Sequence, residues 1–281
     1  MKIDFTKMHG AGNDYIYINC FENDIPFDAD MVRHLSDRNF GIGGDGVIFV
    51  RPSENADTYM DMYNNDGSRG MMCGNGVRCV AKFAYDNKIA DKKTVKVETP
   101  SGIKEIDLLF ESDEAVGGVV DMGNPIFKQA EIPAVGLMLN NSFTFNYEGL
   151  DYSGMALSMG NPHFVVFVED VENIDLPGLS NHIVQSKIFP EGVNVEIVKF
   201  ISPQQYRVRV FERGSGETLA CGTGACAVAV AAITNGFSHK DTDIEIEMNG
   251  GKLIANWKSG GSVFLSGPAT NVYCGTINYA K

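Results

Sequence analysis

Two cysteines stand in positions where a thiol could carry out proton chemistry. Cys73 begins the run Cys-Gly-Asn-Gly, Cys221 begins the run Cys-Gly-Thr-Gly, and an apolar, helix-like stretch follows each run. A cysteine just before a helix faces free backbone N–H groups and the positive end of the helix dipole, which lower a thiol pKa from about 8.5 to roughly 3.5–7.5. We therefore expect each thiol to serve as an acid or a base near neutral pH.

The residues that follow each cysteine suit an anionic ligand. Glycines let the backbone approach a ligand closely, and the N–H groups at a helix start bind carboxylates. We expect Gly74 and Asn75 in the first motif, and Gly222 and Thr223 in the second, to hold a carboxylate such as that of an amino acid.

The chain also repeats itself at an offset of 148 residues, the separation of Cys73 and Cys221. At this offset the following pairs overlay: Gly12-Asn13 and Gly160-Asn161, Tyr63-Asn64 and Phe211-Glu212, Gly102 and Gly250, Lys104 and Lys252. One register holds over about 90 residues, so we interpret the chain as an ancient duplication.

Duplicated thiols could invert a carbon centre. Two lobes related by a pseudo-twofold axis would present their cysteines from opposite sides of one cleft, where one base removes an α-proton and an acid returns a proton to the other face. A thiolate and a thiol suffice, so we expect no cofactor. The glycine-rich run Gly41–Gly46 fits neither the dinucleotide-binding fingerprint nor the P-loop.

These motifs need a scaffold that positions two helices. Residues 225–233 are apolar on every side, which predicts a helix buried all round and ended by Asn235-Gly236. Residues 77–85 predict a second helix with a narrower apolar face. Alternating segments around both helices predict half-buried strands. The prediction is an α+β fold of two pseudo-symmetric domains, with a linker around residues 119–148.

Composition narrows the class of protein. The 281 residues include 23 Lys and Arg against 36 Asp and Glu, a formal net charge of −13 that repels nucleic-acid phosphates and anionic lipid. No apolar run is long enough to span a membrane, and six cysteines without a Cys-x-x-Cys pair indicate reduced thiols and no metal site. We expect a cytoplasmic protein with a small-molecule partner and neither nucleic acid nor membrane.

Four motifs together resemble the diaminopimelate epimerase family over nearly the whole chain. They are Met8–Asp14, Cys73–Cys79, Gly160–His163 and Glu212–Gly224. The resemblance implies a pyridoxal-independent epimerase that interconverts LL- and meso-2,6-diaminopimelate for lysine and peptidoglycan precursor synthesis. It also implies a homodimer, and a mixed sheet or barrel wrapped around a central helix in each lobe, with the active site in the cleft between the lobes.

The resemblance implies lobe boundaries as well. The lobe that carries Cys73 spans residues 1–120 and is joined by the C-terminal segment 268–281. The lobe that carries Cys221 spans residues 121–267.

The resemblance implies a role for each matching residue. Cys73 and Cys221 are the catalytic acid and base, with Gly74, Asn75, Gly222 and Thr223 around the reacting carboxylate. The other polar groups of the substrate are held by Asn13, Asn64, Asn161, Asn194, Glu212 and Arg213, of which Arg213 can grip the distal carboxylate in a bidentate fork. His163 and Glu212 are expected to influence the protonation of the thiols. Gly46 departs from the pattern, because many members carry glutamine there.

Less specific interpretations apply to other residues. Cys20, Cys79, Cys226 and Cys274 are expected to be small hydrophobic residues. Arg78 is expected to be a salt-bridged or solvated residue of the first helical turn, and Asn161 and Asn194 could instead cap turns. Two other functions stay open: a two-cysteine racemase for histidine, a basic amino acid or a proline derivative, and a non-enzymatic thiol protein that senses redox state or binds an amino acid.

Overall fold

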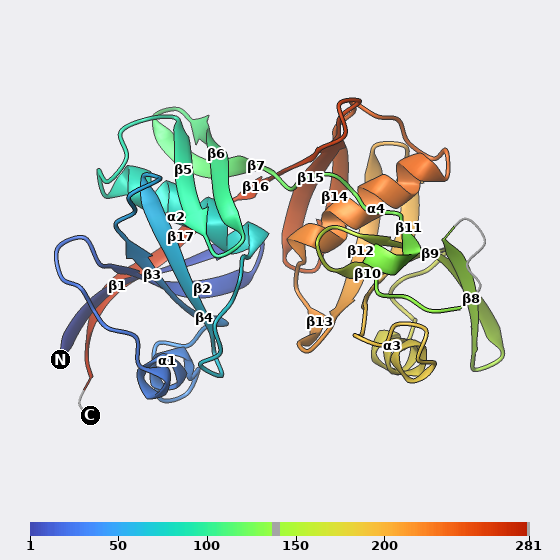
Figure 1. Ribbon diagram of the computed structural model, residues 1–281, viewed down its shortest axis with the longest axis horizontal. Coiled ribbons are helices and arrows are strands. Elements are labelled where there is room, and N and C mark those ends of the chain that lie inside the picture. The colour runs from blue at the N-terminus through green and yellow to red at the C-terminus, as the bar shows by residue number, and fades with distance from the viewer. Residues whose placement is uncertain (137–140, 280–281) are drawn as a thin grey trace. The chain divides into compact units, whose positions relative to one another are not determined.

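The computed structural model describes residues 1–136 and 141–279, and the chain divides into two compact units (Figure 1). Unit 1 comprises Met1–Asp121 and Ser266–Lys281, and unit 2 comprises Met122–Leu265. The fold is α+β, with many strands and few helices in each unit. No helix among the described residues is long and apolar enough to cross a membrane.

Unit 1 is a mixed sheet with two α-helices. Its elements are β1 (Lys2–Gly10), β2 (Asn13–Asn19), α1 (Ala29–Ser36), β3 (Gly46–Arg51), β4 (Thr58–Asn64), α2 (Gly74–Asp86), β5 (Thr94–Thr99), β6 (Gly102–Glu111), β7 (Glu114–Asp121) and β17 (Thr270–Asn278). Strands β17, β1 and β2 are antiparallel neighbours, β2 and β3 are parallel, and β3 and β4 are antiparallel. The C-terminal strand thus completes the sheet that the first strand begins.

Unit 2 repeats this plan. Its elements are η1 (Gln129–Glu131), β8 (Ser142–Tyr147), β9 (Leu150–Ser158), β10 (Pro162–Val168), α3 (Leu176–Gln185), β11 (Asn194–Ser202), β12 (Gln205–Glu212), β13 (Gly216–Thr218), α4 (Gly222–Thr234), β14 (Ile244–Met248), β15 (Gly251–Trp257) and β16 (Val263–Pro268), whose end belongs to unit 1. Strands β8, β9 and β10 are antiparallel neighbours, β10 and β11 are parallel, and β11 and β12 are antiparallel.

Strand register confirms the duplication. Tyr15 of β2 pairs with Gly46 of β3, and at the offset of 148 His163 of β10 pairs with Asn194 of β11. Helices α2 and α4 begin and end at the same offset. The backbones of the two halves therefore match at a single offset as far as the end of the cysteine-bearing helix.

The single offset does not hold beyond the helices. Thr99 pairs with Gly102 across one hairpin turn, and Met248 pairs with Gly251 across the other. The structural partner of Gly102 is therefore Gly251, so the expected overlay on Gly250 was wrong. From the end of the helix to the hairpin turn, unit 2 has one more residue (235–248) than unit 1 (87–99), which shifts the hairpin by one position.

Helix α4 confirms its prediction, because all of its residues from Ala225 to Ala232 are buried and Asn235 caps its end. Helix α2 does not have the narrow buried face that we expected. Its residues from Gly74 to Ala84 are all buried, since it contacts β1, β2 and the strands β4 to β7 (Figure 1). A wrapped sheet leaves no solvent side, so polar residues of α2 must be satisfied inside.

Arg78 illustrates that requirement and rules out the solvated alternative of our expectation, a salt-bridged or solvated residue. Its side chain is fully buried and donates to the carbonyl of Gly74 at 2.9 Å and to Asn75 Oδ1 at 2.8 Å. Lys82 on the same helix is 9% exposed and pairs with Asp86 at 2.8 Å.

Each half contains a second helix that the sequence analysis missed. Asp28 caps α1 and Asp175 caps α3 through side-chain acceptors. Both helices bury aliphatic residues in the core of their own unit, among them Leu35 and Ile183. Both helices are short, at eight and ten residues, so each offers few turns over which a pattern can be recognised in the sequence.

Most of the expected linker belongs to the folded units. Residues 119–121 end β7, 129–131 form η1, and 142–147 form β8, while 137–140 lie outside the described residues. The chain changes unit at Asp121 and again after Leu265.

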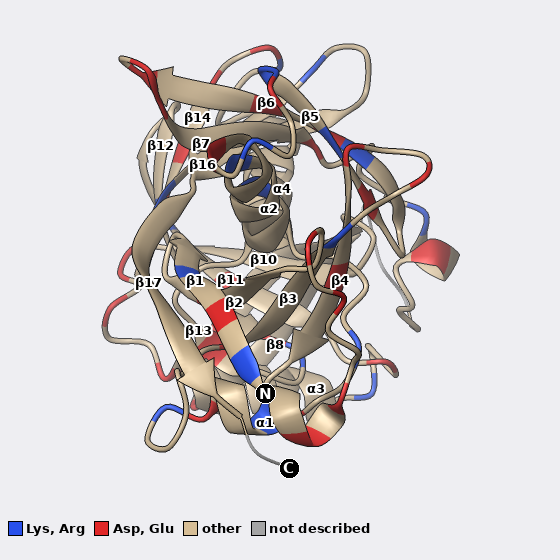
Figure 2. Ribbon diagram, turned by 90° about the vertical axis from the view of Figure 1, so that its left-hand side faces the viewer, with Lys and Arg blue, Asp and Glu red and all other residues tan. Residues whose placement is uncertain are grey.

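Along the ribbon of unit 1, Lys and Arg positions are interspersed with Asp and Glu positions (Figure 2).

Candidate active site

Both motif cysteines occupy the N-cap position of a helix. Cys73 precedes α2 with φ −129° and ψ 120°, and Cys221 precedes α4 with φ −126° and ψ 117°. The N–H of Gly76 donates to Cys73 Sγ at 3.4 Å, and the N–H of Gly224 donates to Cys221 Sγ at 3.4 Å. The sulfur thus takes the place of the serine or aspartate oxygen that usually caps a helix.

Cys73 is held by an asparagine at the start of β2. Its Sγ donates to Asn13 Oδ1 at 3.1 Å, while Asn13 Nδ2 donates to Asp45 Oδ2 at 2.7 Å. The tight turn at Ala11 and Gly12, which both have positive φ, brings Asn13 into β2 directly after β1. The amide is therefore oriented with its oxygen toward the thiol.

Four charged residues anchor that amide, and we call them the unit 1 ion network. Arg38 Nη2 contacts Asp45 Oδ1 at 3.0 Å and Asp14 Oδ1 at 2.7 Å, and Lys7 Nζ contacts Asp14 Oδ2 at 2.5 Å. Burial raises the pKa of Asp14, but hydrogen bonds from Arg38 and Lys7 outweigh it and hold that pKa below its usual value. Asp14 is therefore ionised at neutral pH.

Cys221 is more deeply buried than Cys73. Its side chain is 4% exposed, and its Sγ lies 3.4 Å from Thr223 Oγ1. Burial raises its pKa well above the usual value, and the carboxylates of Glu212 and Glu196 raise it further. Our expectation of a lowered pKa is therefore wrong for Cys221, because loss of water around the sulfur and two nearby negative charges outweigh the helix N-terminus.

A buried histidine–glutamate pair lies in the same unit. His163 Nδ1 is 2.7 Å from Glu196 Oε1, and His163 Nε2 is 3.1 Å from Asn161 Oδ1, with the side chains of His163 and Glu196 fully buried. Burial raises the pKa of Glu196, while the contact with His163 lowers it. The pair orients Asn161, which is the counterpart of Asn13 at the offset of 148.

The hairpin of β12 and β13 carries Glu212 and Arg213. Thr218 Oγ1 donates to Glu212 Oε1 at 2.5 Å, which closes the hairpin three residues before Cys221. The Arg213 N–H donates to Asn194 Oδ1 at 2.8 Å, and its guanidinium donates to the Glu191 carbonyl at 2.8 Å.

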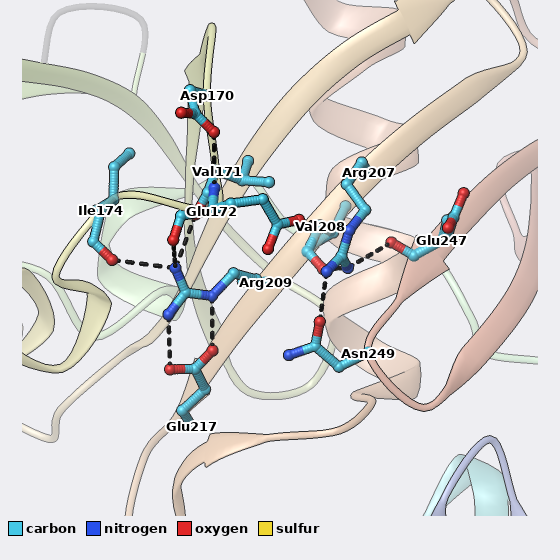
Figure 3. A network of polar contacts seen from close by, with 10 residues as sticks. All are labelled: Asp170, Val171, Glu172, Ile174, Arg207, Val208, Arg209, Glu217, Glu247 and Asn249. Atoms are coloured by element: carbon cyan, nitrogen blue, oxygen red, sulfur yellow. Dashed lines mark hydrogen bonds and ion pairs between the residues drawn. The ribbon is translucent and has the colours of Figure 1, made fainter.

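Two arginines fasten this hairpin to the rest of unit 2 (Figure 3). Arg209 forms a bidentate pair with Glu217 at 2.7 and 2.9 Å and also donates to the carbonyl of Val171. Arg207 donates to Asn249 Oδ1 at the turn between β14 and β15. These contacts hold in place the strands that carry Glu212 and Arg213.

The remaining predicted site residues divide between the two units. In unit 1, Gly74 and Asn75 form the first turn of α2, and Asn64 Nδ2 donates to Ser68 Oγ at 3.0 Å. In unit 2, Gly222 and Thr223 form the first turn of α4. Asn194 is 3% exposed and also donates from Nδ2 to the Pro162 carbonyl at 3.2 Å, so both ends of its amide have partners within the protein.

Gly46 has a steric reason for lacking a side chain. A Cβ there would lie 2.0 Å from the Tyr63 carbonyl oxygen and 2.9 Å from Tyr15 Cε1. The glutamine that many members of the family carry at this position would not fit this backbone without a shift of β3 or β4.

Three of the other four cysteines are buried. Cys79 is fully buried, and burial raises its pKa to about 11, while Cys226 is fully buried in α4. Cys20 is buried, but Cys274 is exposed, so the expectation of burial was wrong for Cys274. None of the six cysteines, all of which lie in the described residues, forms a disulfide. No group of three His, Cys, Asp or Glu residues that could hold a metal ion occurs in the described chain.

Sequence reasoning missed the residues that support the two asparagines. Asp14 and Asp45 stood inside motifs that we examined for other reasons, and Glu196 is a lone carboxylate in the apolar run Val195 to Val198. A single charge within a buried strand was the available signal for Glu196.

Comparisons with known proteins identify the family of this chain. The sequence profile of the family described as Diaminopimelate epimerase matches residues 5–128 and 155–272. A diaminopimelate epimerase from Leptospira biflexa is 45% identical, with 99% of each chain covered. One from Bacillus subtilis is 43% identical, with 95% of this chain and 96% of that protein covered.

Solved structures share the fold at low sequence identity. A PhzF-family phenazine biosynthesis protein from Bacillus anthracis superposes with a TM-score of 0.70 at 14% identity and covers 99% of this chain and 100% of its own. A hydroxyproline epimerase from Agrobacterium vitis gives a TM-score of 0.70 at 13% identity, with 98% and 91% covered. The profile match and the full-length similarity to curated relatives together establish that this chain belongs to the diaminopimelate epimerase family.

Proposed function

We propose that this protein interconverts LL- and meso-2,6-diaminopimelate without pyridoxal phosphate, using Cys73 and Cys221 as its acid and base. The observation that carries the proposal is the matched placement of the two thiols, each capping a helix with nearly identical backbone angles. Relatives that bear the name diaminopimelate epimerase over almost the whole length support the choice of substrate.

The chemistry requires one thiolate and one thiol. The thiolate removes the α-proton from one face of the substrate, the electron pair stays on the α-carbon as a carbanion or enolate, and the thiol delivers its own proton to the opposite face. The pKa of Cys221 is raised by burial and by Glu212 and Glu196, so Cys221 is suited to be the thiol that donates the proton in one direction of the epimerisation. Cys73 is then the base, and the two roles exchange in the reverse reaction.

The substrate carboxylate next to the reacting carbon is bound by first-turn N–H groups. We assign this role to the backbone at Gly74 and Asn75 in unit 1 and at Gly222 and Thr223 in unit 2, because helix starts present N–H groups without intrahelical partners. These dipoles also stabilise the negative charge that develops when the proton leaves.

The distal end of the substrate requires polar partners. We propose that Arg213 pairs with the distal carboxylate, and that Asn13, Asn64, Asn161, Asn194 and Glu212 bind or orient its other polar groups. Lysine lacks that carboxylate and would leave Arg213 unpaired, so discrimination against lysine should reach about 10⁴–10⁵ in kcat/KM. Equal kcat/KM for lysine or histidine would instead favour a racemase for another amino acid.

Exchange of the α-proton with solvent tests the proposal directly. In D₂O, mass spectrometry should find one deuterium at the α-carbon of each inverted diaminopimelate molecule, while lysine stays unlabelled. Absence of deuterium in every candidate amino acid would identify a non-enzymatic thiol protein.

We also propose that the protein works as a cytoplasmic homodimer. The unbridged cysteines suit a reducing compartment. Phe200 and Phe237 expose 45% and 42% of their surface on unit 2, which offers apolar area to a second copy. Light scattering coupled to size exclusion should give twice the 30.6 kDa chain mass, and a monomer mass would contradict the dimer.

A further inference from the structure

A buried carboxylate in unit 2 does not contact the substrate in the mechanism above, yet it lies close to Cys221. Glu196 on β11 is fully buried, and only one of its oxygens, Oε1, has a hydrogen-bond partner among the described residues, namely His163. Burying a carboxylate costs several kcal/mol unless it is well paired (roughly, by transfer estimates). Its retention in an otherwise apolar strand therefore calls for a specific role.

The carboxylate lies against the helix turn that binds the catalytic thiol. A Cβ on Gly224 would be 2.8 Å from Glu196 Oε1 and 3.4 Å from Cys221 Sγ. The N–H of the same glycine donates to Cys221 Sγ. Glu196 thus lies on the same side of the first turn of α4 as the sulfur, within the range where charges influence one another.

Among the described residues, the matching strand position in unit 1 carries no charge. At the offset of 148, Ile48 stands in the place of Glu196 and Tyr15 in the place of His163, with the same strand register. Ile48 Cδ1 would lie 3.2 Å from a Cβ on Gly76, the counterpart of Gly224. The same backbone therefore places a hydrocarbon under Cys73 and a carboxylate under Cys221.

We propose that Glu196 is a positioning residue that keeps Cys221 in its proton-bearing thiol form, and that the contact with His163 favours the charged form of Glu196. The proposal rests on the two-thiol function proposed above. A negative charge beside a thiol disfavours the thiolate, so Cys221 retains its proton until substrate is in place. The charge makes Cys221 a weaker acid, so the thiol keeps its proton in water and releases it only to the strongly basic carbanion of the substrate.

The pKa directions agree with this geometry. Burial raises the pKa of Cys221 first, followed by Glu212 and Glu196, while Thr223 and the Gly224 N–H lower it. For Glu196 burial raises the pKa, His163 lowers it, and Glu212 raises it. These are the groups of β10, β11, β12 and α4 that face the thiol and the carboxylate within unit 2.

The reaction of each thiol with methyl methanethiosulfonate tests the proposal without any substrate. Peptide mass spectrometry would follow modification of Cys221 and of Cys73 in the same sample at about pH 7.5. In Glu196→Gln, loss of a charge should lower the Cys221 pKa and raise the rate of its modification about 3- to 10-fold, since the thiolate fraction grows faster than the nucleophilicity falls. The rate at Cys73 should change less than about 2-fold, because its own unit is untouched.

Matched variants separate charge from shape. Glu196→Asp keeps the charge and should hold the Cys221 rate within about 2-fold of wild type, and Ile48→Val should leave both rates unchanged. If Glu196→Gln does not fold, the double variant His163→Tyr/Glu196→Ile copies the unit 1 pair and should raise the Cys221 rate in the same way. An unchanged Cys221 rate in whichever neutral variant folds would overturn the proposal, as would equal rates in the Asp and Gln variants.

Kinetics then connect the thiol to turnover. In Glu196→Gln the fall of kcat/KM at high pH should begin at a lower pH than in wild type, because Cys221 loses its proton at a lower pH. KM should change less than about 3-fold. If wild-type protein does not epimerise diaminopimelate, the proposed function fails, yet the thiol rates still decide the role of Glu196.

Discussion

The two cysteines share one backbone geometry and have opposite surroundings. Cys73 is half-buried and bonded to Asn13, which the charged and partly exposed unit 1 ion network holds. Cys221 is buried, and the matching asparagine, Asn161, is held by the buried His163. Duplication has preserved the helix caps and the strand register. The polar residues that support each cap, here called its polar layer, have diverged: they are the unit 1 ion network for Cys73, and His163 and Glu196 for Cys221. A reaction that needs one base and one acid benefits from this difference.

The largest effect should come from removing either cap thiol. Cys73→Ala and Cys221→Ala should each lower epimerisation by about 10²–10⁴-fold or more, because a methyl group neither accepts nor donates a proton. Cys79→Ala and Cys226→Ala are matched controls on the same helices. They should cost about 1 kcal/mol of stability and leave activity per folded molecule intact. Near-normal epimerisation from both stereoisomers in either cap variant would contradict the two-base mechanism.

A second test concerns the backbone at Gly46, the strand position in unit 1 that matches Asn194 in unit 2. Gly46→Ala should lower the free energy of unfolding by about 2 kcal/mol, because its Cβ would clash with the Tyr63 carbonyl oxygen. For a chain of this size calorimetry should show a Tm lower by about 4–8 °C. Gly260→Ala is the control, since a Cβ there meets nothing within 4 Å. Equal melting temperatures for the two variants would mean that β3 and β4 adjust freely.

The pH dependence of stability should have opposite signs in the two polar layers. The pKa of Asp14 is lowered in the folded state, so its stabilisation is present above the unfolded value of 3.8 and is lost as pH falls through the folded pKa. Asp14→Asn should therefore cost about 2 kcal/mol at pH 7 and almost nothing near pH 2.

Glu196 has a raised folded pKa, so its contribution is fully present below 4.5 and is lost as pH rises through that pKa. Urea unfolding of Asp14→Asn and Glu196→Gln against wild type should give difference curves of opposite slope. Parallel curves would show that the two layers respond alike.

The smallest effect should come from the unit 1 ion network. Asp45→Asn can no longer pair with Arg38 as an anion, which frees the Asn13 amide to turn and should lower kcat about 10-fold. Asp30→Asn is the control, because its pair with Arg33 is largely exposed and should contribute little. Steady-state kinetics of both variants would measure the difference, and an unchanged kcat in Asp45→Asn would remove the network from the positioning of Cys73.

Sequence by itself determined the elements that depend on local pattern. The cysteine caps, the uniformly apolar helix α4, the duplication and the family resemblance all rest on residue types at short or constant spacing. Capping geometry and helical periodicity act within a few residues, so they are visible in one dimension. The slip from Gly250 to Gly251 was missed because one inserted residue in a loop changes no local pattern.

Tertiary structure alone decided which polar residues surround each thiol. The full burial of α2, the inward course of Arg78 and the raised pKa of Cys221 follow from a sheet that encloses each helix. Glu196 and Asp45 come to their cysteines only through pairing of β11 with β10 and of the segment before β3 with β2. Desolvation and charge depend on every group within several ångströms of an atom, and that neighbourhood exists only once strands distant in sequence lie side by side.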